Sequence, residues 1–188
     1  MTTIVVVRKG ESAVIAADSL TTFGTTRLAP AYDRHPHKVA MYGDSFLGVA
    51  GSAAHQLVLE NLLARTPNLD FHGKAPIYDS FRKLHPILKD EAFLNPKEEE
   101  DDPYESSQMT VMIANPSGIF AVYSMREVFE FDRFWAIGSG RDFALGAMYT
   151  LYESATATRT IAEAGVMAGA EFDTGTSTPI TLHEVKLK

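Results

Sequence analysis

The fold is decided by the first stretch of the chain, Met1-Thr2-Thr3-Ile4-Val5-Val6-Val7. Its run of β-branched residues predicts a strand close to the start, which would hold in place a chain end that otherwise frays. Thr2 is small, so Met1 is expected to be removed, and its removal would leave Thr2 with a hydroxyl and a free α-amine. A hydroxyl needs a nearby base to act as a nucleophile, and an α-amine with an ordinary pKa of about 7.7–8.0 is such a base. Many chains begin with Met-Thr and use neither group, so the rest of the sequence has to decide.

Composition excludes several classes of protein. The 188 residues suit one domain, which we expect to span residues 1–188, and contents of 45% hydrophobic and 22% charged residues are those of a soluble globular protein. The absence of cysteine excludes disulfides and thiol catalysis, and it fits a cytoplasmic location. The net charge of −7 comes without a basic patch, which argues against a nucleic-acid partner. No apolar run is long enough to span a bilayer.

Hydrophobic patterning predicts strands, two helices, strands, two helices and a final strand. The strands are expected at residues 4–7, 12–19, 38–42, 46–50, 109–114, 119–123, 128–131, 134–137 and 180–187. The helices are expected at about residues 52–65, 77–93, 140–153 and 160–171. Tight turns make neighbouring strands antiparallel, and the helices fall outside the hairpins. We therefore expect an α+β fold, a four-layer sandwich of two antiparallel sheets flanked by helices.

The first expected helix has a defined start. Ser52 is a plausible N-cap for it. The residues that follow helical spacing along it are Ala54, Leu57, Val58, Leu62 and Arg65. The preceding strand followed by Gly51 leaves backbone N–H groups free at the helix start. Such groups can receive a negatively charged oxygen. Small residues in the last two helices indicate close helix packing.

Polar residues outside this pattern are weighed one by one. Asp18 ends an apolar strand, where a carboxylate needs a partner; from the two strands alone, a turn or cap residue is the favoured interpretation. Residues 21–37 are expected to be irregular, and loops of that length are often functional. His35 and His37 lie one residue apart with no third ligand nearby, which is a weak signal for a metal. The acidic run 98–102 is typical of a solvated loop, with a basic partner as the alternative.

Six short motifs in order carry a resemblance to a known family. They are Thr2-Thr3-Ile4-Val5, Ala16-Ala17-Asp18-Ser19, Lys38-Val39, Ala50-Gly51-Ser52-Ala53-Ala54, Ile137-Gly138-Ser139-Gly140 and Asp173-Thr174-Gly175-Thr176-Ser177. Together they resemble the proteasome β-type subunits, a family of N-terminal nucleophile hydrolases, and among these HslV and the betaproteobacterial proteasome homologues. The resemblance covers essentially the whole chain. It departs at Thr176 and Ser177, where the family usually has serine then glycine, and at His55, where an acid is frequent.

The resemblance implies a threonine-type endopeptidase and a role for each matched residue. Thr2 is the implied nucleophile, Asp18 and Lys38 pair beside it, and Ser139 and Asp173 orient its amine. The implied supporting residues are Gly51, whose N–H receives the oxyanion, Thr176, which stands near Asp173, and Val49, Ala53 and Ala31, which line a pocket for an apolar residue before the cut. No metal and no organic cofactor is implied.

The resemblance also implies an assembly. The family forms a homo-oligomeric double ring of 12 or 14 subunits that encloses polypeptide substrates. A separate ATP-dependent unfoldase ring is the implied partner, because the chain has no phosphate-binding Gly-rich Lys motif. A leader of Met1 alone is expected, with no propeptide. Two alternatives remain open: a catalytically inactive ring or scaffold subunit, and an N-terminal nucleophile amidohydrolase acting on small amides.

Overall fold

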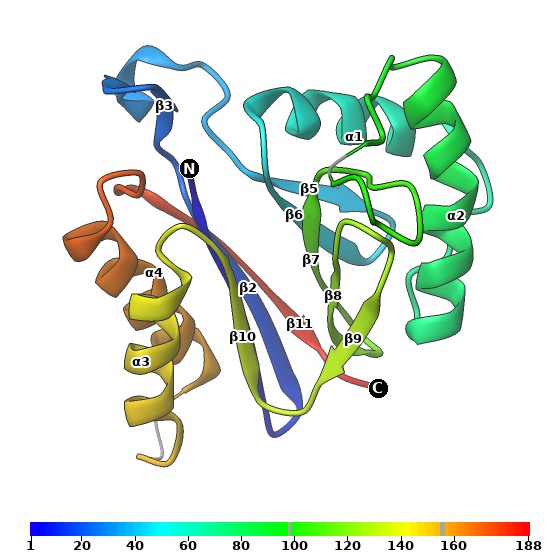
Figure 1. Cartoon of the computed structure of the whole chain (residues 1–188). Coiled ribbons are helices and arrows are strands. Elements are labelled where there is room, and N and C mark those ends of the chain that lie inside the picture. Colours follow the sequence, from blue (N-terminus) through cyan, green and yellow to red (C-terminus); the bar gives the residue numbers. More distant parts are fainter. Residues whose placement is uncertain (98, 155–156) are drawn as a thin grey trace.

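The computed structural model describes residues 1–97, 99–154 and 157–188, and it arranges them in four layers (Figure 1). Two sheets stack face to face, with one pair of helices on each outer face. This confirms the predicted α+β sandwich. None of the helices in the described ranges is long and apolar enough to cross a membrane.

The first sheet is built around the N-terminal strand. Its order is β10 (Phe134–Gly138), β1 (Thr3–Lys9), β2 (Ser12–Asp18) and β11 (Ile180–Lys186), and all neighbours are antiparallel. Val5 pairs with Ala136 on one side and with Ala16 on the other. A central strand is held by ladders on both edges, so the start of the chain is fixed in position.

The second sheet has five antiparallel strands in sequence order. They are β5 (Val39–Tyr42), β6 (Ser45–Ala50), β7 (Thr110–Asn115), β8 (Gly118–Val122) and β9 (Val128–Phe131). Alternate residues of β1 separate the layers: Ile4 and Val6 face this second sheet, whereas Val5 and Val7 face the helices on the other side. Both faces of the first sheet are therefore buried, as its apolar strands predict.

Four helices complete the sandwich. They are α1 (Ala53–Arg65), α2 (Lys74–Asp90), α3 (Arg141–Tyr152) and α4 (Thr158–Phe172). In Figure 1, α3 and α4 cover the first sheet, and α1 and α2 cover the second. The segment 21–37, expected to be irregular, contains a short hairpin of β3 (Thr21–Phe23) and β4 (Thr26–Leu28) and one 3-10 turn, η1 (Pro30–Tyr32).

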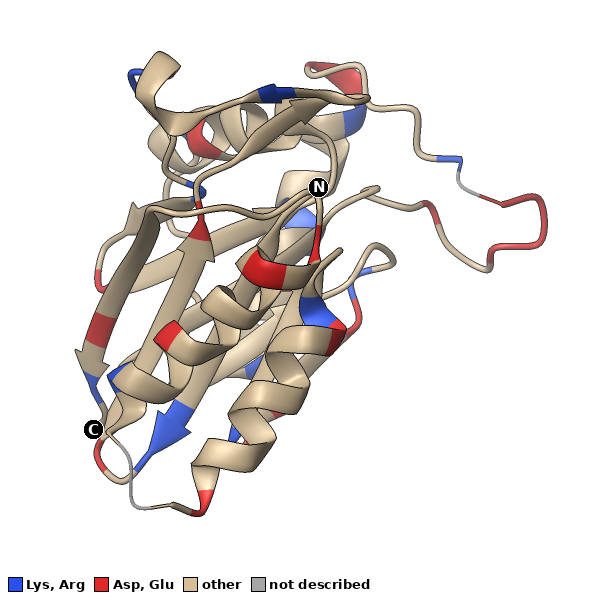
Figure 2. Cartoon of the chain, turned by 90° about the vertical axis from the view of Figure 1, so that its left-hand side faces the viewer, with Lys and Arg blue, Asp and Glu red and all other residues tan. Residues whose placement is uncertain are grey.

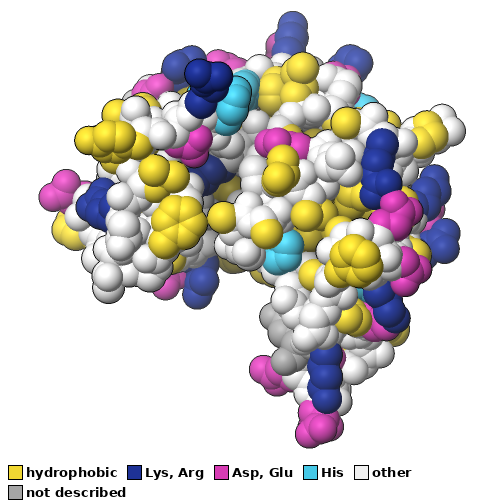
Figure 3. Space-filling model, turned by 90° about the horizontal axis from the view of Figure 1, so that it is seen from above, with side chains coloured by type: hydrophobic (Ala, Val, Ile, Leu, Met, Phe, Trp, Pro, Cys, Tyr) yellow, Lys and Arg dark blue, Asp and Glu magenta, His cyan; other side chains and the backbone are white. Residues whose placement is uncertain are grey.

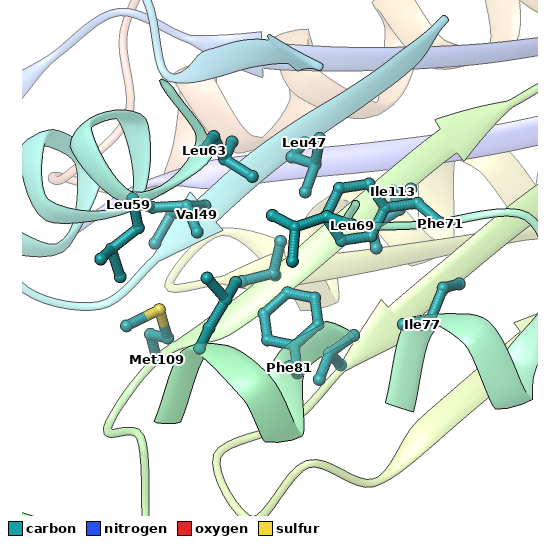
Figure 4. Close-up of a cluster of buried hydrophobic side chains, with 14 of the residues drawn as sticks. Leu47, Val49, Leu59, Leu63, Leu69, Phe71, Ile77, Phe81, Met109 and Ile113 are labelled. Carbon is teal, nitrogen blue, oxygen red and sulfur yellow. The ribbon is translucent and has the colours of Figure 1, made fainter. Parts of the chain in front are cut away.

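The buried face of α1 differs from the one that the spacing predicts. The structure buries His55, Leu59, Leu62 and Leu63, whereas Leu57 is 71% exposed. Figure 4 shows Leu59 and Leu63 directed into a cluster with side chains of the second sheet and α2. The helix is leucine-rich on more than one side, and contact with the sheet, which periodicity does not reveal, selects the face.

The acidic run forms part of a projecting loop. Glu99 and the two aspartates that follow Glu100 lie in a segment that extends away from the sandwich (Figure 2). Lys97 pairs with Glu100 at 3.6 Å, and both side chains are exposed. Glu98 lies outside the described residues. The loop is a solvated one, as its charge predicts.

Close packing of α3 against α4 depends on Gly165. A Cβ added there would lie 2.9 Å from Met148 Cγ and 3.1 Å from Met148 Sδ. We expect Gly165→Ala to be less stable than Gly146→Ala by about 1–3 kcal/mol, because the added methyl overpacks the helix interface. Gly146 is the matched control, since it lies in α3 with nothing within 4 Å of a new Cβ. Chemical unfolding of both variants at one protein concentration measures the difference, and equal stability would contradict it.

Candidate active site

Thr2 directly precedes the first residue of the central strand β1. It is only 5% exposed. The backbone N–H of Thr2 donates to Ser139 Oγ at 3.2 Å, and its hydroxyl donates to Asp18 Oδ1 at 3.0 Å. In the printed chain Met1 precedes Thr2, so this N–H belongs to a peptide bond; removing Met1 turns it into an α-amine. Thr2 therefore stands between two groups of polar side chains.

Asp18 forms the centre of the first group. Its side chain is fully buried at the end of β2. Oδ1 accepts from Lys38 Nζ at 2.7 Å and from the N–H of Thr3 at 3.0 Å, and Oδ2 accepts from the N–H groups of Leu20 at 3.0 Å and Ser177 at 3.3 Å. A buried carboxylate is stabilised by such hydrogen bonds and by an opposite charge. Lys38 and these backbone N–H groups are therefore the partners that the buried carboxylate of Asp18 needs.

Lys38 is the cation of this pair. Its side chain is 14% exposed, and Nζ also lies 3.5 Å from the carbonyl oxygen of Met1. Burial lowers the pKa of Lys38 from its usual value, and the carboxylates of Asp18 and Asp173 offset part of that effect. A cation whose proton is less tightly held than usual therefore stands next to the Thr2 hydroxyl.

Ser139, Asp173 and Thr176 form the second group. The hydroxyls of Ser139 and Thr176 both donate to Asp173 Oδ2, at 2.7 and 2.6 Å. Burial raises the pKa of Asp173, but these two hydrogen bonds, one from the backbone of Gly175 and the nearby N-terminal charge outweigh it, so the pKa is lowered. Asp173 is thus a carboxylate that orients Ser139 beneath the Thr2 nitrogen. Thr176 supplies a hydroxyl here in spite of the departure from the family pattern.

Thr3 seals the region behind Thr2. It is fully buried, and its hydroxyl lies 2.7 Å from Thr176 Oγ1. A Cβ at Gly140 would stand 2.1 Å from Thr3 Oγ1, and one at Gly169 would stand 2.7 Å from it. Gly140 is the N-cap of α3, and Gly169 lies near the C-terminal end of α4. Only glycine at these two positions leaves room for Thr3. At Gly138, where φ is +92°, a Cβ would stand 2.1 Å from the carbonyl oxygen of Thr2.

A cavity of about 310 Å³ opens beside Thr2. Thr2, Lys38, Val49, Gly51 and Ala53 all line it, so the structure brings the predicted nucleophile, cation, oxyanion donor and pocket residues together. Figure 3 views this end of the molecule from above, where hydrophobic, histidine and charged side chains are mixed on the surface. Ala31 does not line this cavity: it is exposed on η1, because the 3-10 turn carries it outward.

Sequence reasoning missed most of the cavity wall. The further lining residues are Met1, Leu20, Thr21, Thr22, Phe23, Leu28, Asp33, His35, Pro36, His37, Ser52 and Gln56. Most come from the long segment 21–37. Its length and lack of a repeating pattern predict a functional loop, but nothing in its sequence tells which side chains turn inward.

Within the described ranges, no three His, Asp or Glu side chains gather in a way that could hold a metal ion. The two histidines of the loop make other contacts. The backbone N–H of His35 donates to Asp33, and the ring of His37 lies 3.0 Å from Thr181 Oγ1. Among the residues that the structure describes, His35 and His37 therefore have no third ligand beside them.

Comparison with known proteins places the chain in a family. No family model and no curated protein matches its sequence. The solved structure of Thiobacillus denitrificans BPH, a betaproteobacterial proteasome homologue, matches with a TM-score of 0.93 and 37% identity over 99% of this chain and 98% of that chain. The same protein in complex with epoxomicin matches with a TM-score of 0.92 and 36% identity over 99% of both chains. Eukaryotic HslV from Trypanosoma brucei shares the fold, with a TM-score of 0.71 and 19% identity over 98% of this chain and 99% of that chain.

The four-layer sandwich is thus the fold of the proteasome-type N-terminal nucleophile hydrolases. The high identity to BPH across almost the whole of both chains settles the family. The chain belongs to the betaproteobacterial proteasome homologues.

Proposed function

We propose that this chain is a threonine-type endopeptidase whose nucleophile is Thr2 after removal of Met1. One observation carries the proposal: the hydroxyl of Thr2 contacts the Asp18–Lys38 pair, while its nitrogen contacts Ser139, which is bound to Asp173. Each of the two reacting groups on Thr2 has its own polar support: the Asp18–Lys38 pair is largely buried, and the Ser139–Asp173 pair lies nearer the surface. An inactive scaffold subunit would need neither.

The reaction follows from this arrangement. Thr2 Oγ attacks the carbonyl carbon of a peptide bond while its proton passes to the neutral α-amine. Lys38, as a cation, favours the developing alkoxide. The N–H of Gly51 donates to the oxyanion, a contribution of about 2.7–4 kcal/mol by comparison with other hydrolases. The peptide C–N bond then breaks, and the α-amine returns its proton to the leaving amine.

The product of this step is an ester between the substrate acyl group and Thr2. A water molecule attacks the ester carbonyl, the α-amine accepts its proton, and Thr2 Oγ leaves and is protonated again. Ser139 and Asp173 keep the amine oriented through both steps. All these groups belong to the protein, so the proposed mechanism uses no metal and no organic cofactor.

The proposed substrate is a polypeptide with an apolar residue before the cut. Val49 and Leu20 are buried apolar residues of the cavity wall, and the small Ala53 leaves room beside them. The whole chain, residues 1–188, is proposed to act as one peptidase domain within a cytoplasmic double ring of 12 or 14 subunits. The likeness to BPH and HslV supports a ring and a protein substrate, and a separate ATP-dependent unfoldase is proposed by analogy.

Intact mass of the purified protein before and after epoxomicin tests the proposal. BPH forms a complex with this peptide epoxyketone, a class of compound that requires both the hydroxyl and the free amine of an N-terminal threonine. We expect a chain that lacks Met1 and gains one adduct per subunit. A chain that lacks Met1 and gains no adduct, with no turnover of unfolded protein, would contradict the proposal.

A further inference from the structure

His55 lies at a place where the proposed reaction depends on backbone geometry. It is 9% exposed, in the first turn of α1, three residues after the N-cap Ser52. Its Nδ1 accepts from the N–H of Ser52 at 3.3 Å, and Ser52 Oγ accepts from the N–H of Ala54 at 3.4 Å. This is a reciprocal capping arrangement, in which glutamate or glutamine is the usual partner at the position of His55.

The imidazole also lies close to the residue that carries the proposed oxyanion donor. An added Cβ at Gly51 would stand 2.8 Å from His55 Nδ1 and 3.2 Å from the carbonyl oxygen of Gln108. Gly51 has a φ of +155°, which a side chain would rarely adopt. The ring therefore fills the space beside the Cα of Gly51 and accepts a hydrogen bond from the N–H of the peptide that follows it.

This contact sets the state of the ring. The donor is a backbone N–H, so Nδ1 must be unprotonated and the proton of a neutral ring must sit on Nε2. In a protonated ring Nδ1 also carries a proton, so two donors, Nδ1–H and the N–H of Ser52, would face each other. The hydrogen bond would then be lost, and the Gly51–Ser52 peptide would be free to turn.

We propose that His55 is a positioning residue: in its neutral form it holds the Gly51–Ser52 peptide and so restricts rotation about the backbone of Gly51, which keeps the N–H of Gly51, a part of the preceding Ala50–Gly51 peptide, directed at the oxyanion. Its protonation switches this support off. The proposal rests on the proposed function of Thr2 and Gly51 and adds to it a control by pH that is built into the helix cap.

The surroundings of the ring favour its neutral form. Burial lowers the pKa of His55 from its usual value of 6.5, and no charged side chain of the described residues contributes to that shift. Three charged side chains on the neighbouring elements are paired with other groups. Along α1 Glu60 binds Gln56, across the cavity Lys38 binds Asp18, and beyond Gln108 the ammonium of Lys97 binds Glu100.

The pH profile of turnover provides the first test. Below the pKa of the α-amine, log kcat/KM should fall by one per pH unit, and below the pKa of His55, under 6.5, it should fall by two. His55→Gln offers a neutral acceptor that does not titrate, so its profile should keep a slope of one. Identical slopes in wild type and His55→Gln would overturn the proposal while leaving the function of Thr2 standing.

Substitution at constant pH gives the second test. At pH 8, His55→Ala should lose roughly 10- to 100-fold in kcat with KM changed less than about twofold, since an oxyanion donor acts mainly in the transition state. His55→Gln should recover most of that loss. A purely structural role would lower the amount of folded ring without the split between kcat and KM, and that result would count against the proposal.

Stability against pH tests the neutral ring without any need for turnover. The folded-state pKa of His55 lies below its unfolded value, so the unfolded chain binds the extra proton first and stability falls as pH drops below 6.5. In a Thr2→Ala background, the drop in Tm from pH 7.5 to 5.5 should be smaller when His55 is replaced by glutamine. An equal drop would show that the ring is not held neutral. Failure of the proposed function would instead appear as absence of turnover and labelling in the wild type.

Discussion

Thr2→Ala should reduce peptide turnover by roughly 10³-fold or more and abolish labelling by epoxomicin, because it removes the only nucleophile of the proposed mechanism. Its fold should survive. The lost side chain makes one hydrogen bond to Asp18, a contribution of about 0.5–1.5 kcal/mol. Alanine is also small, so removal of Met1 is expected to continue.

Thr2→Ser is the matched control. It keeps the hydroxyl, the α-amine and the small size of the residue, and it loses only the methyl group that lies near Gly138. We expect Thr2→Ser to retain both labelling and measurable turnover. Peptide hydrolysis and intact mass on the same preparations separate the two variants. Turnover by Thr2→Ala above about a tenth of wild type would mean that another group attacks the substrate.

Asp18→Asn and Lys38→Met should both lose at least about 100-fold in turnover and lose labelling, but they should differ in stability. Both oxygens of Asp18 accept hydrogen bonds, and an amide can present oxygen on one side only. Asp18→Asn therefore turns an NH₂ group toward buried donors and leaves Lys38 without its counter-charge. We expect a destabilisation of about 3–5 kcal/mol.

Lys38→Met should destabilise the fold less than Asp18→Asn does. It removes the cation, yet the carboxylate of Asp18 keeps four other donors: the Thr2 hydroxyl and the N–H groups of Thr3, Leu20 and Ser177. We expect a destabilisation of about 1–3 kcal/mol. Unfolding in denaturant at one protein concentration gives the order of the two variants. A larger loss for Lys38→Met, or unchanged activity in either variant, would contradict the proposed role of the pair.

Local patterning was sufficient to predict the layers of this fold. Apolar strands with tight turns gave the two antiparallel sheets, and they placed Thr2 and Asp18 at strand ends. Once β1 and β2 pair with Ile4 opposite Ala17, those two ends must meet. The Thr2–Asp18 contact is therefore a consequence of a short hairpin, although the strands alone did not assign Asp18 to the site and only the family resemblance did.

Contacts between distant segments were not predictable in the same way. Ser177 reaches Asp18 from 159 positions away, and the N–H that it donates carries no side-chain signal. Helical spacing did not select the buried face of α1, because a leucine-rich helix satisfies several spacings. A large part of the cavity wall comes from segment 21–37, whose side chains are placed by the β3–β4 hairpin and η1 rather than by a repeating pattern.

The position of Met1 has a practical consequence for producing this protein. Met1 lines the cavity, and a Cβ at Gly175 would stand 2.1 Å from Met1 Cβ, so any peptide fused ahead of Thr2 would run through the site. The other end of the chain is at the opposite side of the molecule (Figure 1), where the N–H of Lys188 donates to the carbonyl of Pro116 at 2.9 Å. An affinity tag or fluorescent label therefore belongs after Lys188. A tag fused ahead of Thr2 would block the site, and such a preparation would be inactive even if the native protein is a peptidase.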